Sequence, residues 1–159
     1  MTAKYAADTT VSPDRSRAEI EKLLLRYGSD GFAYSSERDR AMIAFRCRGR
    51  MVRYIISLPD QKSKEFTETP SRRWVRSPEE AAKAWEQACR ARWRTLALVV
   101  KAKLEAIEVG ISTFDEEFLS WIVLPDNTTV GQHALSAMKS AYETGTLPPM
   151  LPPRADYKG

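Results

Sequence analysis

Histidine, cysteine and glycine are scarce in this chain of 159 residues, which contains one histidine, two cysteines and seven glycines. One imidazole and two thiols far from it in the sequence cannot supply a zinc site with the usual Cys and His spacing. No glycine-rich nucleotide-binding motif occurs, and the nucleophile motif G-x-S-x-G is also missing. We therefore expect a protein that uses no metal or cofactor and is not an enzyme.

Long apolar runs are missing as well. No stretch of about 18 apolar residues is present to form a membrane span, and residues 1–12 lack the basic and apolar regions of a signal peptide. We expect an intracellular, cytoplasmic protein in which Cys47 and Cys89 are buried thiols rather than a disulfide. His133 has no nucleophile or orienting acid near it in the sequence, so a solvated imidazole is favoured over a general base.

The strongest local signal is a long amphipathic helix over residues 77–108. Ser77 is a suitable N-cap, Pro78 suits the first helical position, and Glu80 completes a capping box. Gly110 is placed to end the helix. Apolar residues then recur at spacings of three and four, which predicts one buried stripe on this helix: Trp85, Cys89, Trp93, Leu96, Val100, Leu104 and Ile107.

A short antiparallel sheet is predicted before this helix. Another helix, over 13–27, precedes three segments rich in β-branched or aromatic residues at 31–35, 40–47 and 50–58. The two-residue connection Arg48–Gly49 pairs Phe45 with Val52 and Ile43 with Tyr54. These pairs define the face that is expected to receive the long helix. Whether the sheet has three or four strands stays open, since residues 66–69 are a candidate for a short edge strand.

Two further helices are predicted at the C-terminal end, because capping boxes occur at Thr113 with Glu116 and at Thr129 with Gln132. The predicted fold is α+β: a sheet of three or four strands, one long helix packed on it and two C-terminal helices that close the other end of that helix. The predicted organisation is a flexible lead (1–11), a single domain (12–146) and a proline-rich extended tail (147–159).

Positive charge is concentrated in the first two thirds of the chain. Residues 1–110 contain 22 Lys or Arg against 15 Asp or Glu, whereas residues 111–159 contain 3 against 6. Arginine binds phosphate and carboxylate bidentately. The candidate contact residues follow the predicted hairpin, the connector and the long helix: Arg46, Arg48, Arg50, Arg53, Arg72, Arg73, Trp74, Arg76, Arg90 and Arg94. Those of the hairpin and connector are expected to form one continuous patch.

Trp74 is the aromatic residue most exposed in this prediction, because it lies among arginines in a polar connector, whereas Trp85 and Trp93 lie on the apolar stripe. A ring beside guanidinium groups can stack on a base while the arginines bind phosphate. The same residues can instead contact an acidic protein surface or anchor the loop. All of these interpretations stay open at this point.

The order helix, three strands, helix is shared with the double-stranded RNA-binding domain. That family opens its second helix with lysines, whereas Glu79 and Glu80 stand here and would repel phosphates. The chain resembles small uncharacterised proteins of tailed bacteriophages and prophages along 85–104 (WEQACRARWRTLALVVKAKL), along 124–131 (LPDNTTVG) and in the proline-rich segment 147–152. The resemblance implies a bacterial host cell as the setting and implies no activity.

The sequence therefore predicts a small non-enzymatic accessory protein that binds nucleic acid through its arginine-rich hairpin and connector. The alternative is a protein-binding module, such as a phage-encoded inhibitor or adaptor that docks on an acidic host protein. A homodimer through the long helix is one arrangement compatible with either function.

Overall fold

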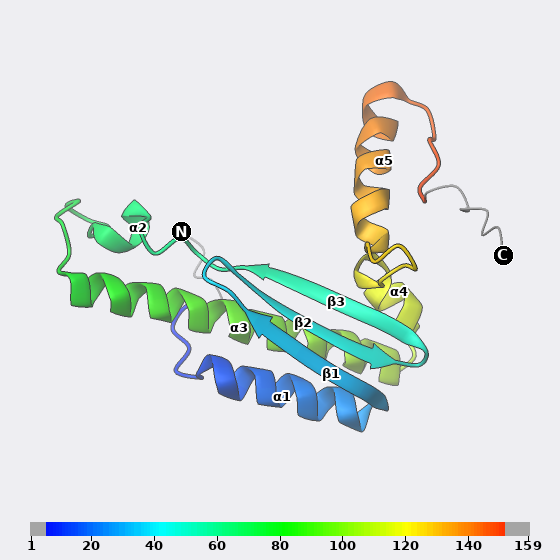
Figure 1. The fold of residues 1–159 in the computed structure, drawn as a ribbon, viewed down its shortest axis with the longest axis horizontal. Coiled ribbons are helices and arrows are strands. Elements are labelled where there is room, and N and C mark those ends of the chain that lie inside the picture. The colour runs from blue at the N-terminus through cyan, green and yellow to red at the C-terminus, as the bar shows by residue number, and fades with distance from the viewer. Residues whose placement is uncertain (1–5, 152–159) are drawn as a thin grey trace.

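The structure, a computed structural model, describes residues 6–151 and has the predicted α+β fold (Figure 1). Its elements in chain order are α1 (Pro13–Arg26), β1 (Ser29–Ser36), β2 (Arg40–Cys47), β3 (Arg50–Ser57), α2 (Lys64–Thr67), α3 (Pro78–Glu108), α4 (Phe114–Phe118), the 3-10 helix η1 (Leu119–Trp121) and α5 (Val130–Thr144). Residues 1–5 of the expected lead and 152–159 of the expected tail lie outside the described residues. Within the described range, no helix is both long and apolar enough to cross a membrane.

Helix α3 begins and ends where its sequence predicts. The Ser77 hydroxyl accepts a hydrogen bond from the Glu80 amide at 3.3 Å, and the Glu80 carboxylate accepts one from the Ser77 amide at 3.0 Å. Val109 is the C-cap, and Gly110 follows with φ of 77°. A helix of 31 residues is about 46 Å long, so α3 spans the domain from end to end.

The sheet has the antiparallel order β1-β2-β3. The predicted register is confirmed, because Phe45 pairs with Val52 and Ile43 with Tyr54. Strand β1 brings Phe32 opposite Phe45 and adds its own apolar side chains to this face. The alternation along β2, where Ala41, Ile43, Phe45 and Cys47 are buried, marks one covered face.

Within the described residues the sheet has three strands, and the candidate edge strand at residues 66–69 does not join it. Residues 64–67 form the single helical turn α2, whose N-cap Ser63 accepts a hydrogen bond from the Glu65 amide. The local cap thus competes successfully with extended pairing, and it turns Phe66 into the domain, where this side chain is 3% exposed.

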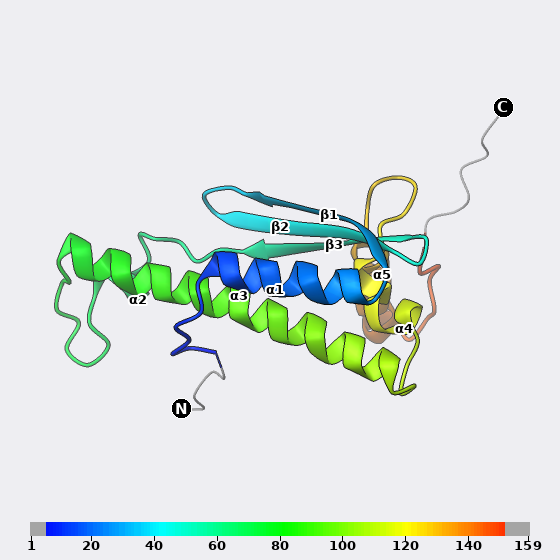
Figure 2. The same ribbon diagram turned by 90° about the horizontal axis from the view of Figure 1, so that it is seen from below.

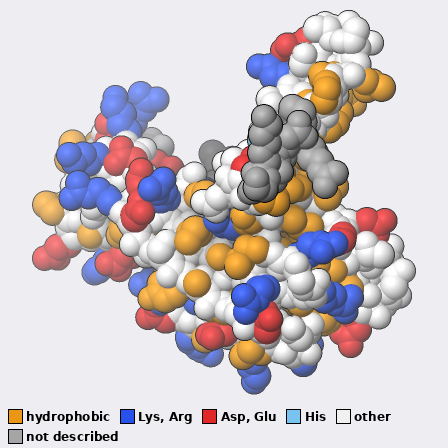
Figure 3. Space-filling view, turned by 45° about the vertical axis from the view of Figure 1, so that its right-hand side comes forward, with side chains coloured by type: hydrophobic (Ala, Val, Ile, Leu, Met, Phe, Trp, Pro, Cys, Tyr) orange, Lys and Arg blue, Asp and Glu red, His pale blue; other side chains and the backbone are white. Residues whose placement is uncertain are grey.

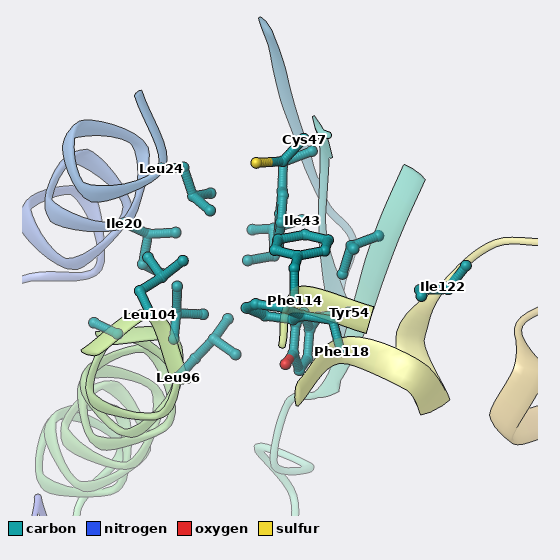
Figure 4. Packing of buried hydrophobic residues seen from close by; sticks show 14 of the residues in the cluster. Ile20, Leu24, Ile43, Cys47, Tyr54, Leu96, Leu104, Phe114, Phe118 and Ile122 are labelled. Carbon is teal, nitrogen blue, oxygen red and sulfur yellow. The ribbon is translucent and has the colours of Figure 1, made fainter. Parts of the chain in front are cut away.

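Helices α1 and α3 lie together on one face of the sheet and form a second layer (Figure 2). Their apolar side chains meet those of β2 and β3 in one core cluster, with Ile20 and Leu24 from α1 and Leu96 and Leu104 from α3 (Figure 4). Trp93, which is 4% exposed, belongs to this cluster. Trp85 is only half-buried, and its indole N–H donates to the Pro59 carbonyl oxygen at 2.7 Å.

The core is closed at the C-terminal end of α3 by α4. The Phe118 ring meets the Phe45 ring edge to face at 5.6 Å between centroids, and Phe114 and Phe118 are both buried. Only part of the expected arrangement is correct, because α5 does not close this end. It packs on η1 and projects away from the two layers (Figure 1). Gly131 permits this contact, since a Cβ there would lie 2.7 Å from the Ser120 carbonyl oxygen.

The described part of the lead is attached to α3. Ala6 is 6% exposed, and the Gln87 side-chain amide donates to the carbonyl oxygens of Ala7 and Thr9 at 2.9 and 2.8 Å. The chain is therefore positioned on the outer side of α3 before α1 begins at Pro13.

We predict that Trp93→Ala lowers the free energy of unfolding by about 3–5 kcal/mol, because it removes a large ring from the core. The matched control is Trp74→Ala, which removes the same side chain from a site where it is 63% exposed. The control should change stability by less than about 0.5 kcal/mol. Urea denaturation measures both values, and equal losses would show that the wrong face of α3 has been assigned to the core.

We also predict that Gly131→Ala destabilises the domain. The added Cβ would collide with a backbone carbonyl that cannot move freely, and such overpacking costs about 1–3 kcal/mol, more than the gain in helix propensity. Ser136→Ala, in the middle of the same helix, is the control and should be nearly neutral. Thermal unfolding compares the two variants, and a stabilised Gly131→Ala protein would mean that α5 does not rest on Ser120.

Candidate nucleic-acid interface

The candidate arginines of the hairpin and those of the connector lie at opposite ends of the molecule. The turn between β2 and β3 lies beside the C-terminal end of α3, as the ion pair of Arg50 with Asp115 requires, while the connector lies at the N-terminal end of α3. About 46 Å of helix separates them (Figure 1). The expectation of one continuous patch is therefore wrong. Both groups pack on the same sheet and helix, but they lie at different ends of the domain.

Most arginines of the hairpin already have partners. Arg46 forms an ion pair with Asp30 at 2.8 Å, and Arg50 forms one with Asp115 at 3.1 Å. Arg53 donates to the side-chain and backbone oxygens of Asn127 at 3.0 and 2.7 Å. These contacts reduce what the three guanidinium groups can offer to a ligand.

Arg48 has a different role in the hairpin. It occupies the first position of the two-residue turn with φ of 51°, and Gly49 follows with φ of 73°. Two successive positive φ values are those of a type I′ turn, which matches the twist of the paired strands. Arg48 is exposed and forms no ion pair within the described residues. It is thus a single free cation at this end of the sheet.

The two candidate arginines of α3 make contacts within the layer formed by α1 and α3. Arg94 forms an ion pair with Glu19 of α1 at 2.6 Å, and both side chains are half-buried. Arg90 donates to the Gln87 side chain at 3.1 Å and lies 3.6 Å from Glu86. Arg94 thus joins α3 to α1, while Arg90 contacts other residues of α3, and neither lies with either end group.

The connector is folded as a small hairpin. Glu68 and Val75 form an antiparallel bridge, and the Thr69 amide donates to the Trp74 carbonyl oxygen at 2.8 Å. Arg76 donates to the carbonyl oxygens of Glu65 and Phe66, at 3.1 Å each, and so fixes the hairpin to α2. Arg76 is therefore a structural residue of the connector.

The tip of this hairpin, residues 70–74, presents the remaining candidates. Trp74 is 63% exposed, and the Arg72 guanidinium carbon lies 5.3 Å from the centroid of its ring. Neither Arg72 nor Arg73 forms an ion pair within the part of the chain that the structure describes. Figure 3 shows Lys and Arg side chains gathered at this end, with Asp and Glu side chains beside them. Two free guanidinium groups and one exposed ring are thus held together at the tip.

His133 has a hydroxyl partner five residues before it and an acidic partner seven residues before it, so the expectation that no orienting acid lies near it in the sequence is wrong. Its Nε2 atom lies 2.6 Å from the Thr128 hydroxyl and 3.1 Å from Asp126. The hydroxyl itself donates to the other oxygen of Asp126 at 2.6 Å. Both contacts fall on one ring nitrogen, whereas a catalytic triad uses one nitrogen for the acid and the other for the nucleophile. This cluster therefore orders the loop before α5 and does not activate Thr128.

The two cysteines are buried, as expected, and burial raises the pKa of both thiols. A raised pKa keeps them protonated and unreactive. Among residues 6–151 no cluster of three His, Cys, Asp or Glu side chains is arranged to hold a metal ion.

The carboxylates of the acidic C-terminal third are used inside the fold. Hydrogen bonds from the Thr113 amide and hydroxyl lower the pKa of Glu116, and those from Ser112 and Lys103 lower the pKa of Glu117. The Thr128 hydroxyl and amide, followed by His133, lower the pKa of Asp126. These carboxylates therefore act as helix caps and as hydrogen-bond acceptors within the fold, rather than as a ligand-binding cluster.

These lowered pKa values predict acid sensitivity. A carboxylate whose pKa is lower in the folded state stabilises the fold above its unfolded pKa of about 4 and loses this effect as the pH falls through the folded pKa. In Glu116→Gln the amide can keep the capping hydrogen bond, as Gln132 does at Thr129. The stability difference between parent and variant should shrink from pH 7 to about pH 3 in urea titrations. A stability difference that stays constant over this pH range would show that the charge of Glu116 does not stabilise the fold.

Comparisons of the chain with protein-family models, with curated proteins and with solved structures find no match. No relative therefore supplies a ligand or an activity by analogy. The function must therefore be inferred from the side chains themselves. At the tip of the connector hairpin, two arginines that form no ion pair within the described residues lie with a tryptophan that is 63% exposed.

Proposed function

We propose that this protein is a small non-enzymatic accessory protein that binds nucleic acid, and that it does so through the connector tip of Arg72, Arg73 and Trp74. The observation that carries the proposal is the exposed Trp74 ring beside two arginines that have no acidic partner within the described residues. The proposal follows the phage resemblance in placing the protein in the cytoplasm of a bacterial host cell.

The tip suits an unpaired strand. A guanidinium group binds a phosphate through two parallel hydrogen bonds, and an indole ring stacks on any base that is not already stacked in a duplex. Arg72 covers only one side of the Trp74 ring, at 5.3 Å from its centroid, and the ring remains 63% exposed. We therefore assign single-stranded nucleic acid as the ligand class.

The surroundings of the tip disfavour a duplex. Duplex binding draws on many phosphate contacts along two strands, whereas Glu79 and Glu80 follow the hairpin at the start of α3. Hydrogen bonds from the Ser77 amide and hydroxyl lower the pKa of Glu80, so this carboxylate stays charged at neutral pH. Negative charge behind the tip would repel a second strand.

The tip also has the rigidity that binding needs. The bridge of Glu68 with Val75 and the Arg76 contacts to α2 fix both ends of the hairpin. Arg73 has φ of 51°, a conformation that is stable only where the surrounding hydrogen bonds enforce it. A ligand would therefore meet a preformed surface and would not have to order a loose loop.

The hairpin of β2 and β3 is a weaker candidate. Arg46 and Arg50 would have to release Asp30 and Asp115 to bind phosphate. Arg53 donates to Asn127, and among the candidate arginines of this hairpin only Arg48 has neither an ion pair nor a side-chain hydrogen bond within the described residues. No exposed aromatic ring accompanies it on the described part of that turn.

The alternative function is that of a protein-binding module that docks on an acidic protein through the same tip. Val75, which is 85% exposed, favours it, because a protein partner could bury this apolar side chain together with Trp74, whereas it adds nothing to phosphate binding. A titration with labelled oligonucleotides separates the two, since only the first function predicts their binding.

We predict that Arg72→Gln with Arg73→Gln weakens binding to a labelled single-stranded oligonucleotide by more than tenfold. Loss of two phosphate contacts should also reduce the slope of log affinity against log salt by about 1 to 2. Trp74→Ala should weaken binding by about 1–3 kcal/mol without changing that slope, because stacking releases no counterions. Fluorescence anisotropy over a salt series, with DNA and RNA in single- and double-stranded form, measures both.

The matched control is Arg46→Gln with Arg50→Gln, which removes the same charge from the other end of the domain. It should lower the affinity only slightly and leave the salt slope nearly unchanged. Equal losses in the two double variants would show that net charge matters and the tip does not. No binding of any oligonucleotide by the parent protein would reject the proposed function.

A further inference from the structure

Helix α5 carries an apolar face that nothing covers within the described residues. Leu135, Met138 and Tyr142, here called the α5 stripe, follow each other at spacings of three and four and lie on one side of the helix. They are 59%, 45% and 89% exposed. In Figure 3 the helix stands clear of the body, with hydrophobic side chains along one side and charged ones on another.

The α5 stripe continues a contact that the domain already makes. Gly131 lies four residues before Leu135 on the same side, and it is buried against Ser120 of η1. Beyond this first turn the helix leaves the body, so the same side becomes exposed. The stripe thus begins as an intramolecular interface and ends as an open one.

The described part of the tail, which ends at residue 151, does not cover the stripe. Residues 148–151 fold back along α5 and form a shallow groove with His133, Ala137 and Ser140. At 100° per residue these three positions lie about half a turn away from Leu135, Met138 and Tyr142. The tail therefore packs on the opposite side of the helix.

An uncovered apolar stripe is unfavourable for a helix of this length. Isolated helices of about 15 residues are marginally stable in water, and most of their stability in proteins comes from packing an apolar face. Helix α5 has 15 residues and packs mainly on η1. Its outer turns, which carry Met138 and Tyr142, would gain most from a partner.

The exposed area suits a pair of identical chains. The three side chains of the stripe and Leu119 of η1, which is 52% exposed, present on the order of 500 Å² of apolar surface. A two-fold interface uses the same patch twice and would bury about 1,000 Å², the lower limit for a specific contact. Such an interface is self-complementary and weak.

The charges on α5 favour a second copy over a charged partner. Lys139 and Glu143 lie on the flank of the stripe, 3.8 Å apart, and cancel each other. A basic or an acidic partner would find no opposite net charge here, while a second copy meets no net repulsion. The apolar stripe of α3 is not available for this role, because its residues from Cys89 to Leu104 are buried.

We propose that two copies of this chain associate through their α5 stripes, independently of any ligand at the connector tip. The full chain should show a reversible equilibrium between monomer and dimer, with a dissociation constant on the order of 1–100 µM, as expected for an interface of this size. Sedimentation velocity from about 1 to about 500 µM protein measures it by mass action. A parent protein that stays monomeric over this range would overturn the proposal.

Two variants place the contact on α5. Leu135→Gln with Tyr142→Gln should abolish the dimer, and Tyr142→Gln alone should weaken it at least several-fold. The single variant changes a side chain that is 89% exposed, so it leaves the folded monomer intact. Leu25→Gln on α1 is the matched control, because Leu25 and Leu135 are both 59% exposed.

The control should dimerise like the parent. A dimer that persists unchanged in the Tyr142→Gln protein, or one that is lost equally in Leu25→Gln, would refute the assignment to α5. Oligonucleotide affinity measured at low protein concentration should be the same in all of these variants. A failure of the dimer proposal can therefore be distinguished from a failure of the proposed nucleic-acid binding.

Discussion

The packing of the α3 stripe against the sheet is the contact on which the other features of the domain depend. Trp93, Leu96, Val100 and Leu104 fill the space beneath β2 and β3, and α1 then lies beside α3 to complete the layer (Figures 2 and 4). Because α3 is about 46 Å long, it holds the connector at one end and α4 at the other. The length of α3 therefore keeps the surfaces at its two ends too far apart to form one binding site.

This geometry divides the positive charge of the chain into groups with different uses. At the C-terminal end of α3, Arg50 pairs with Asp115 of α4 and Arg53 donates to Asn127, so both stabilise the contact of the hairpin with the segments that follow α3. In the middle, Arg94 joins α3 to α1. At the N-terminal end Arg72 and Arg73 meet no acid within the described residues, and the exposed Trp74 lies with them. Net charge alone would not distinguish these three situations.

The domain thus presents two surfaces of different chemistry. The connector tip combines cations with an aromatic ring, while the α5 stripe is apolar and carries no net charge on its flank. They lie at opposite ends of the molecule in Figure 1, so one can be occupied without blocking the other. If both proposals hold, a dimer would carry two separated tips and could bind one strand at two points, which raises its effective affinity.

The sequence by itself determined the elements whose signals are local. Caps such as Ser77 with Glu80, the stripe of α3 and the register across Arg48–Gly49 depend on residues three or four positions apart, or on one turn, and all are present as predicted. It also indicated the exposed Trp74, because a ring in a polar connector has no periodic core to join. It left residues 66–69 as a candidate edge strand, whereas residues 64–67 form a helical turn, because a four-residue segment has too weak a pattern to distinguish extended from helical backbone.

Only the tertiary structure decided which arginines are free. The acids that occupy Arg46, Arg50 and Arg94 lie 16, 65 and 75 residues away in the chain, and no local spacing reveals such pairs. The same holds for α5, whose apolar face resembles a core stripe in the sequence. Whether that face is buried depends on where the folded chain places the helix, and here it projects beyond the core.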